Sequence, residues 1–245
     1  MNKLLGYLFT PIHYLFFGLV LCIFHPVQWA SLKFGGLEAH KRSVDLMNFF
    51  LVGTYFIMGS SVSFRNVQQL PENRPVIFVA NHQSMYDIPP LIWFLRKHHP
   101  KFISKIELTK GIPSISFNLK YGGGANIDRK DSKQAVAEIL KLGERMEEHN
   151  WSAVIFPEGT RSRDGRLKQF AVGGIATILK RCPDALIVPV AIKGSWKFVQ
   201  YGSFPLSFGE KISWTVLAPL ENEGGPLEDL VLRVENQIRA VVEGS

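Results

Sequence analysis

The side chains best suited to catalysis are His82 and Asp87, which lie five residues apart. A neutral imidazole can take a proton from a hydroxyl, and a carboxylate behind the ring fixes its tautomer and stabilises the imidazolium that forms. On a regular α-helix the two side chains would point roughly 140° away from each other, because there are 3.6 residues per turn. If they cooperate, they must therefore do so across a turn.

Two other interpretations of this pair remain open on spacing alone. His82 could hydrogen-bond only the backbone at the end of a strand, while Asp87 caps a helix, since Asp is favoured at the N-cap. A metal site is a weaker alternative, because no other His, Cys or carboxylate lies at ligand spacing nearby. We therefore expect no metal at this position.

The residues around the pair favour a strand, a loop and then a helix. Residues 75–80 form an uninterrupted apolar run with the length and β-branched content of a buried strand. Asp87 is followed by Ile88-Pro89, a pattern typical of the first turn of a helix. His82 would thus lie at the end of a strand, where the scaffold holds a loop firmly and solvent still reaches it.

The rest of the chain alternates between strand-like and helix-like segments. Strands are expected at 101–104, 125–128, 153–156, 185–192 and 213–217, the last at a sheet edge, and helices at 113–120, 132–149, 173–181 and 227–242. This alternation predicts an α/β fold with a mostly parallel central sheet flanked by helices. The strand at 153–156 would deliver the residues after it to the same edge as His82.

Composition narrows the class of partner. The formal net charge of +7 favours acidic partners. Because the sequence holds no nucleic-acid motif and no Lys/Arg-rich run, we expect lipid headgroups or phosphorylated substrates rather than nucleic acid. The two cysteines, Cys22 and Cys182, do not suggest a disulfide framework.

Several motifs occur together in one order along the chain. After the N-H-x-x-x-x-D segment at 81–87 come four further blocks, at 105–113, 126–129, 156–162 and 187–190. With these blocks in this order, residues 70–215 resemble the glycerolipid acyltransferase family. Within it, the chain is most similar to the bacterial 1-acylglycerol-3-phosphate acyltransferases.

The resemblance implies a reaction. The acyl group of a thioester, on coenzyme A or acyl carrier protein, would pass to the sn-2 hydroxyl of 1-acyl-glycerol-3-phosphate (lysophosphatidic acid), giving phosphatidic acid. His82 would act as the base and Asp87 would hold its ring. The absence of a G-x-S-x-G motif agrees with direct attack without an acyl-enzyme. No cofactor is expected besides the thioester co-substrate.

The resemblance also implies roles for residues outside the pair. Those matched to acceptor and phosphate binding are Arg129, Glu158, Gly159, Thr160 and Arg161. Arginine suits a phosphate because its planar fork donates hydrogen bonds in pairs and stays charged. Lys105 is a candidate to stabilise charge on the thioester oxygen, although backbone amides could do this instead.

Two alternative functions remain open. The same chemistry could act on another lysolipid, such as a lyso-ornithine lipid or a lysophospholipid with a headgroup, because related acceptors also carry phosphate. The chain could instead be a non-catalytic membrane-surface binding protein. The intact His82, Asp87 and 158–161 block argue against that second alternative.

The N-terminal region predicts an attachment to the membrane. Residues 4–32 and 46–64 carry no charged side chain, and each run is near the length of about 20 residues that crosses a bilayer. Two full spans would place the basic linker between the runs opposite the catalytic domain. Because basic linkers favour the cytoplasm, that arrangement would put the catalytic domain outside, away from its cytosolic thioester donors.

We therefore expect a pair of helices that dips into one leaflet from the cytosolic side. One span followed by an interfacial helix, or two buried helices of a soluble protein, are the alternatives. The expected domains are a membrane-associated helical pair at 1–66 and an acyltransferase domain at 67–245. The active site would then face the cytoplasm at a bacterial inner membrane.

Overall fold

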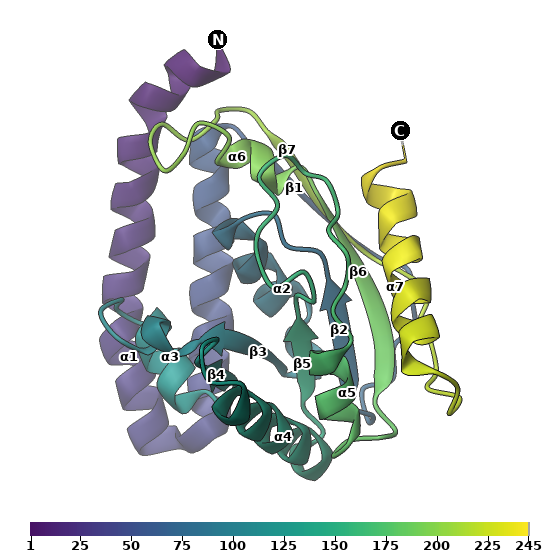
Figure 1. The fold of residues 1–245 in the computed structure, drawn as a ribbon. Helices are drawn as coiled ribbons and strands as arrows, with labels where there is room; N and C mark the ends of the chain where they lie inside the picture. The colour runs from purple at the N-terminus through teal and green to yellow at the C-terminus, as the bar shows by residue number, and fades with distance from the viewer. Residues whose placement is uncertain (245) are drawn as a thin grey trace.

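A seven-stranded sheet forms the centre of the protein, whose computed structural model describes residues 1–244 (Figure 1). The strands are β1 (Ser61–Asn66), β2 (Val76–Ala80), β3 (Pro100–Lys105), β4 (Ala125–Ile127), β5 (Ser152–Ile155), β6 (Leu186–Lys193) and β7 (Lys211–Val216). They lie in the order β1-β7-β6-β2-β5-β3-β4, and every neighbouring pair is parallel except β6 and β7. The predicted α/β fold with a mostly parallel sheet is confirmed.

Helices cover both faces of this sheet. They are α1 (Asn2–Gly53), α2 (Ile88–Phe94), α3 (Ile115–Tyr121), α4 (Ser132–His149), α5 (Gly173–Leu179), α6 (Ser195–Phe198) and α7 (Leu227–Val242), with 3₁₀ turns at 54–58, 85–87, 96–98 and 106–109. Side chains alternate across a strand. In β2, Ile77 and Val79 accordingly join the core under α4, α5 and α7, whereas Phe78 joins the core on the opposite face.

Strand β1 is a difference from the sequence-based expectation. Residues 61–64 belong to the charge-free run that was expected to form the second membrane helix, but they pair in parallel with β7, from Ser61 opposite Lys211 to Asn66 opposite Val216. The predicted edge position of the 213–217 strand is therefore wrong, because β1 covers it. The sheet begins at Ser61, six residues before the expected domain boundary.

Helix α1 changes direction once. Gly36 has φ 70° and ψ −165°, outside the helical region, and this conformation is open to glycine because it lacks a Cβ. The two halves on either side of Gly36 run side by side in Figure 1. By length and composition the element is apolar enough to cross a membrane.

Helix α1 is hydrogen-bonded to the sheet domain at Tyr86. The His13 ring donates from Nδ1 to the Thr54 carbonyl over 3.0 Å, so its Nε2 accepts from the Tyr86 hydroxyl at 3.3 Å. Thr10 accepts a hydrogen bond from the Leu206 amide at 2.9 Å. Helix α1 is thus fixed to the same loop that carries Asp87.

Candidate active site

Strand β2 delivers His82 to the carboxyl edge of the sheet, as the sequence predicts. Asn81, which lies between the end of β2 and His82, is buried. Its side chain donates one hydrogen bond to β6 and accepts another from it. Its side-chain amide donates to the Ile192 carbonyl at 2.9 Å, and its carbonyl oxygen accepts from the Ile192 amide at 2.7 Å. The start of the loop therefore cannot shift without breaking the edge of β6.

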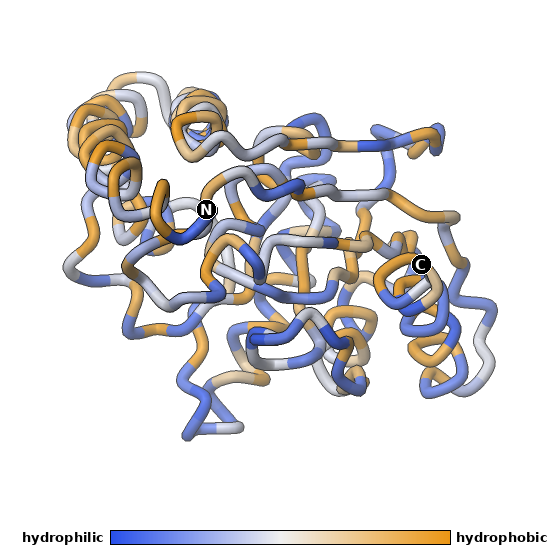
Figure 2. Tube along the Cα trace, turned by 90° about the horizontal axis from the view of Figure 1, so that it is seen from above, coloured by the Kyte–Doolittle hydropathy of each residue, from blue (hydrophilic) through white to orange (hydrophobic). Residues whose placement is uncertain are grey.

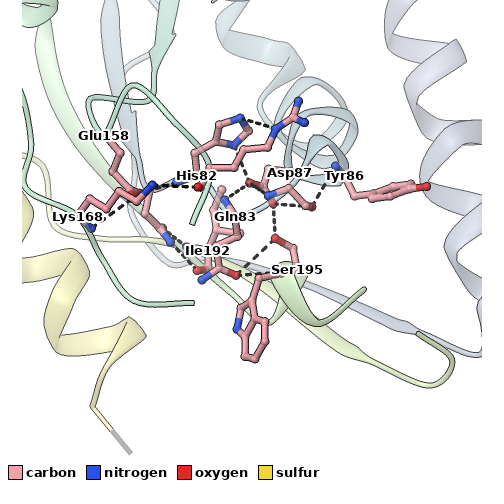
Figure 3. A network of polar contacts seen from close by, with 12 residues as sticks. His82, Gln83, Tyr86, Asp87, Glu158, Lys168, Ile192 and Ser195 are labelled. Atoms are coloured by element: carbon pink, nitrogen blue, oxygen red, sulfur yellow. Dashed lines mark hydrogen bonds and ion pairs between the residues drawn. The ribbon is translucent and has the colours of Figure 1, made fainter. Parts of the chain in front are cut away.

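The structure brings His82 and Asp87 together across a turn (Figure 3). His82 Nδ1 lies 2.9 Å from Asp87 Oδ2. The same carboxylate oxygen accepts from the Gln83 amide at 2.7 Å and the Ser84 amide at 2.9 Å, while Ser195 Oγ donates to Oδ1. Because an ionised carboxylate only accepts, the ring proton belongs on Nδ1, which leaves the lone pair of Nε2 for another proton.

Asp87 takes part in a cap, but not as the expected N-cap of the following helix: its side chain makes no cap hydrogen bond to α2, and it is the third residue of a capping box that Ser84 begins. Ser84 Oγ accepts from the Tyr86 amide at 3.1 Å, and Asp87 reaches back to the Ser84 amide, forming a capping box around the 3₁₀ turn at 85–87. Asp87 is fully buried. One carboxylate therefore both fixes the turn and orients the imidazole.

The segment after β5 closes the other side of the imidazole. The His82 ring stacks on Phe156, with centroids 4.1 Å apart and planes inclined by 18°. Arg161 Nε lies 3.3 Å from His82 Nε2, and the Ser162 amide donates to the His82 carbonyl at 2.8 Å. Two motifs more than seventy residues apart in the chain thus meet around one ring.

Glu158 anchors the backbone of the same histidine. Its carboxylate accepts from the His82 amide at 2.8 Å and from the Lys168 amide at 3.2 Å. Burial raises the pKa of Glu158 to about 7, and these two hydrogen bonds only partly oppose that shift. Gly159 has φ 68° and donates to the Phe156 carbonyl at 3.1 Å, which makes the tight turn that positions Glu158.

Lys168 belongs to this loop as well. Its Nζ donates to Thr160 Oγ1 at 2.8 Å and to the Arg161 carbonyl at 3.0 Å. Thr160 and Arg161 are exposed, so they remain available to a ligand. Lys168 stabilises the loop that presents them.

Lys105 and Arg129 lie at the same sheet edge but further from the ring. Lys105 is the exposed last residue of β3, and Arg129 is exposed just after β4. Strand β4 lies two strands from β5, which corresponds to roughly 10 Å at the usual strand spacing. The structure places neither side chain in hydrogen-bonding contact with His82 among residues 1–244, and their roles stay predictions.

Sequence reasoning missed three polar residues that support the pair: Gln83, Lys168 and Ser195. Ser195 lies 108 positions after Asp87, and no local pattern could have linked the two. The Ser84-x-x-Asp87 spacing, in contrast, is a readable capping signal. Among residues 1–244, the structure places no group of three or more His, Cys, Asp or Glu side chains where it could hold a metal ion.

A cavity of about 360 Å³ lies beside the pair, between the second half of α1, α2, β3 and α3. Met85 and Arg161 contribute to its lining, and apolar side chains such as Leu51, Ile92 and Phe102 form most of it. At the amino end of β3, the lining includes Lys101. Burial, together with a smaller effect of the nearby Lys41 ammonium, lowers the pKa of Lys101 to about 8.

Comparison with known proteins gives consistent similarities. Residues 61–193 match the family model described as Acyltransferase. The chain is 32% identical over 159 residues to human 1-acyl-sn-glycerol-3-phosphate acyltransferase beta, covering 65% of this chain and 55% of the relative. It is also 32% identical over 143 residues to the chloroplastic 1-acyl-sn-glycerol-3-phosphate acyltransferase LPAT1 of Arabidopsis thaliana, covering 58% and 38%.

A solved structure is similar over almost the whole chain. The crystal structure of the 1-acyl-sn-glycerophosphate acyltransferase PlsC from Thermotoga maritima has a TM-score of 0.82 and 25% sequence identity, and the match covers 99% of this chain and 97% of that one. The alignments with the Arabidopsis and human relatives are shorter: they span 38% of the length of the Arabidopsis protein and 55% of the length of the human protein.

The raised pKa of Glu158 predicts a pH-dependent stability. A carboxyl whose pKa rises from 4.5 unfolded to about 7 folded favours the folded state most at low pH, and that contribution is lost as pH rises between these values. The Glu158→Gln variant cannot ionise. The melting temperature of the variant minus that of the wild type should therefore increase as the pH is raised from 4.5 to 7. Thermal unfolding of both proteins across that pH range measures this difference. A difference that does not vary with pH would contradict the shifted pKa.

Proposed function

The chain belongs to the acyltransferase family, and on that premise we propose that it transfers an acyl group from a thioester to the sn-2 hydroxyl of lysophosphatidic acid, forming phosphatidic acid. The observation that carries the proposal is the 2.9 Å contact between His82 Nδ1 and Asp87 Oδ2, which leaves Nε2 able to accept a proton. The relatives and the solved structure are named as acyltransferases of 1-acyl-sn-glycerol-3-phosphate, which supports this acceptor.

The proposed chemistry uses the side chains of the site and the two substrates alone. His82 Nε2 takes the proton of the sn-2 hydroxyl as its oxygen attacks the thioester carbonyl, and Asp87 stabilises the imidazolium. Collapse of the tetrahedral intermediate breaks the carbon–sulfur bond. The imidazolium then returns its proton to the departing thiolate, which leaves as the free thiol of the donor.

Arg161 is the proposed contact for the acceptor's phosphate. In the structure its guanidinium lies against His82 Nε2, the nitrogen that the acceptor hydroxyl must reach. A phosphate bound beside the pair would draw this cation away from the ring, because charge-assisted contacts to phosphate are stronger than one to a neutral nitrogen. Gly159, Thr160 and the more distant Arg129 are proposed to complete the phosphate site.

We assign the cavity beside the pair to an acyl chain. Its volume of about 360 Å³ lies within the roughly 300–1,000 Å³ of typical small-ligand pockets, and its lining is mostly apolar. Arg161 and Met85 connect the cavity to the catalytic loop. An acyl chain in this cavity would have its reacting end beside His82.

The exposed side of α1 is proposed to lie in one membrane leaflet, with the active site facing the cytoplasm at a bacterial inner membrane. Large apolar side chains remain exposed along both halves of the helix, among them Leu15 (60% exposed) and Ile23 (59%). Figure 2 shows the apolar colour concentrated on these helices. Exposed apolar surface of this extent is typical of a membrane-contacting face.

The proposed base predicts the effect of His82→Ala. Release of free thiol from acyl-CoA should require lysophosphatidic acid, and the variant should lose roughly 100-fold or more of kcat, because general base catalysis typically contributes 10²–10⁴-fold. The matched control is His149→Ala, an exposed histidine at the end of α4, which should retain activity. Near-normal turnover by the His82 variant would disprove the assignment. If the wild type turned over only with a different lysolipid, the proposed acceptor would be wrong, and the assignment of His82 as the base would stand.

The proposed phosphate contact predicts the effect of Arg161→Ala. The KM for lysophosphatidic acid should rise about 10-fold or more, because a hydrogen bond to a charged group is worth roughly 1.5–3 kcal/mol. The KM for the thioester should stay unchanged. Arg163→Ala, an exposed neighbour, serves as the control in the same steady-state assay. An acceptor KM equal to that of the wild type would remove Arg161 from the phosphate site.

The membrane proposal predicts the effect of placing charge on α1. The Leu15→Glu/Ile23→Glu variant should fail to float with phosphatidylethanolamine–phosphatidylglycerol vesicles on a density gradient. Its circular dichroism in detergent should match that of the wild type, because both positions are exposed. The control is Val136→Glu/Leu232→Glu, which places the same charges at apolar positions that are 45% and 53% exposed on α4 and α7. Equal flotation of both variants would contradict the proposal.

A further inference from the structure

A second hollow, of about 720 Å³, lies at the same edge of the sheet as His82 but towards β6 and β7. We call it the β6–β7 groove; its lining residues come from the 164–166 loop, from 193–197, from the start of β7 and from the end of α7, with Gln83 between it and the catalytic loop. Figure 1 shows α7 on the opposite side of the sheet from α1. The lining of the groove thus includes the end of the helix that lies across the sheet from α1.

The charge of the groove is predominantly positive. Its four basic residues are Arg166, Lys193, Lys197 and Lys211, against the two acids Asp164 and Glu243. Both acids already accept hydrogen bonds from the protein: Asp164 from Ser162 and the Arg166 amide, and Glu243 from Arg239 and the Leu167 amide. Asp164 also lies 3.9 Å from the Arg166 guanidinium, so the excess positive charge of the groove comes from Lys193, Lys197 and Lys211.

Two of the four cations are uncommitted. Lys193 donates to the carbonyls of Val241 and Gly244 at the end of α7, which gives it a structural role. Lys197 and Lys211 are exposed and, within residues 1–244, make no hydrogen bond or ion pair through their side chains. A phosphate that entered the groove would meet these two ammonium groups.

The lining of the groove also includes an aromatic ring. Trp196 is half-buried, and Lys197 Nζ lies 5.9 Å from its ring. Gly165, at φ 82°, lets the loop backbone approach the indole so closely that a Cβ there would overlap it. The loop thereby holds the ring in place, and a fixed indole is a suitable surface for stacking a nucleic-acid base.

The groove is continuous with the catalytic loop. The Trp196 amide lies 3.4 Å from Gln83 Oε1, which accepts its hydrogen, and Gln83 directly follows His82. The preceding Ser195 donates to Asp87. A ligand in the groove would thus lie one residue away from the reacting ring.

We propose that the β6–β7 groove binds the phosphorylated nucleotide end of coenzyme A, with the adenine on Trp196 and the phosphates against Lys197 and Lys211. The proposal rests on the acyl-transfer function and names the donor's binding site. The pantetheine arm would pass Gln83 to bring the thioester to His82. A concave site of this volume with an aromatic ring suits a nucleotide better than the convex surface of a folded carrier protein.

Binding of unacylated coenzyme A to the full chain in detergent tests the groove without any need for turnover. Isothermal titration calorimetry of Lys197→Glu/Lys211→Glu should show a Kd at least 10-fold above the wild type, since two charge-assisted phosphate contacts are reversed. Trp196→Ala should also weaken binding by about 10-fold, in the range reported for loss of one base–aromatic stack. Adenosine 3′,5′-bisphosphate should compete with coenzyme A for the wild type.

The matched control is Lys133→Glu/Lys180→Glu, which makes the same change of charge at exposed lysines on α4 and at the end of α5. It should bind coenzyme A as the wild type does; an equal loss would mean a general charge effect and would overturn the site. In steady state, the groove variants should raise the KM for acyl-CoA with kcat retained.

Two further outcomes separate the groove from the overall function. If the wild type binds coenzyme A through Lys197, Lys211 and Trp196 but transfers no acyl group, the groove stands and the proposed reaction fails. If the wild type turns over acyl carrier protein thioesters only, and the groove variants raise the KM for that donor, the groove serves a carrier protein and the nucleotide assignment is overturned.

Discussion

The buried carboxylate of Asp87 is the interaction on which the site depends. It accepts hydrogen bonds from the His82 ring, from two successive backbone amides of the catalytic loop and from Ser195 after β6. A buried charge of this kind is stable only because both carboxylate oxygens have hydrogen-bond donors. The bonds that stabilise the charge are therefore also the bonds that fix the tautomer and orientation of His82.

A second carboxylate, Glu158, holds the same histidine from the opposite side through the backbone amide. The two acids differ in environment. Asp87 accepts hydrogen bonds from five donors, whereas Glu158 accepts from two, and burial raises the pKa of Glu158 to about 7. Glu158 thus ties the arginine-bearing loop to the catalytic loop, and Lys168 holds Thr160 and the Arg161 backbone from beneath. The proposed acceptor-binding loop is thus hydrogen-bonded to the backbone of the proposed base.

The arrangement of polar and apolar surface around this centre is asymmetric. Apolar side chains of α1 and the acyl-sized cavity lie on one side of the pair, and the cationic groove with Trp196 lies on the other. A reaction between a lipid-borne acceptor and a water-soluble thioester needs this kind of boundary. His13 and Thr10 fix α1 to the domain, so the boundary is maintained by specific hydrogen bonds as well as by hydrophobic contact.

The sequence by itself determined the parts of this protein whose signals are local. The apolar run before His82 and the helix at 132–149 were readable because the length of an apolar run and helical periodicity depend on neighbours within a few residues. The pairing of β1 with β7, the bond from Ser195 to Asp87 and the packing of Gly165 against Trp196 were decided only by the tertiary structure. Each joins residues separated by about 30 to 150 positions, and local propensity carries no information about which distant partner a strand edge or an unsatisfied carboxylate will find.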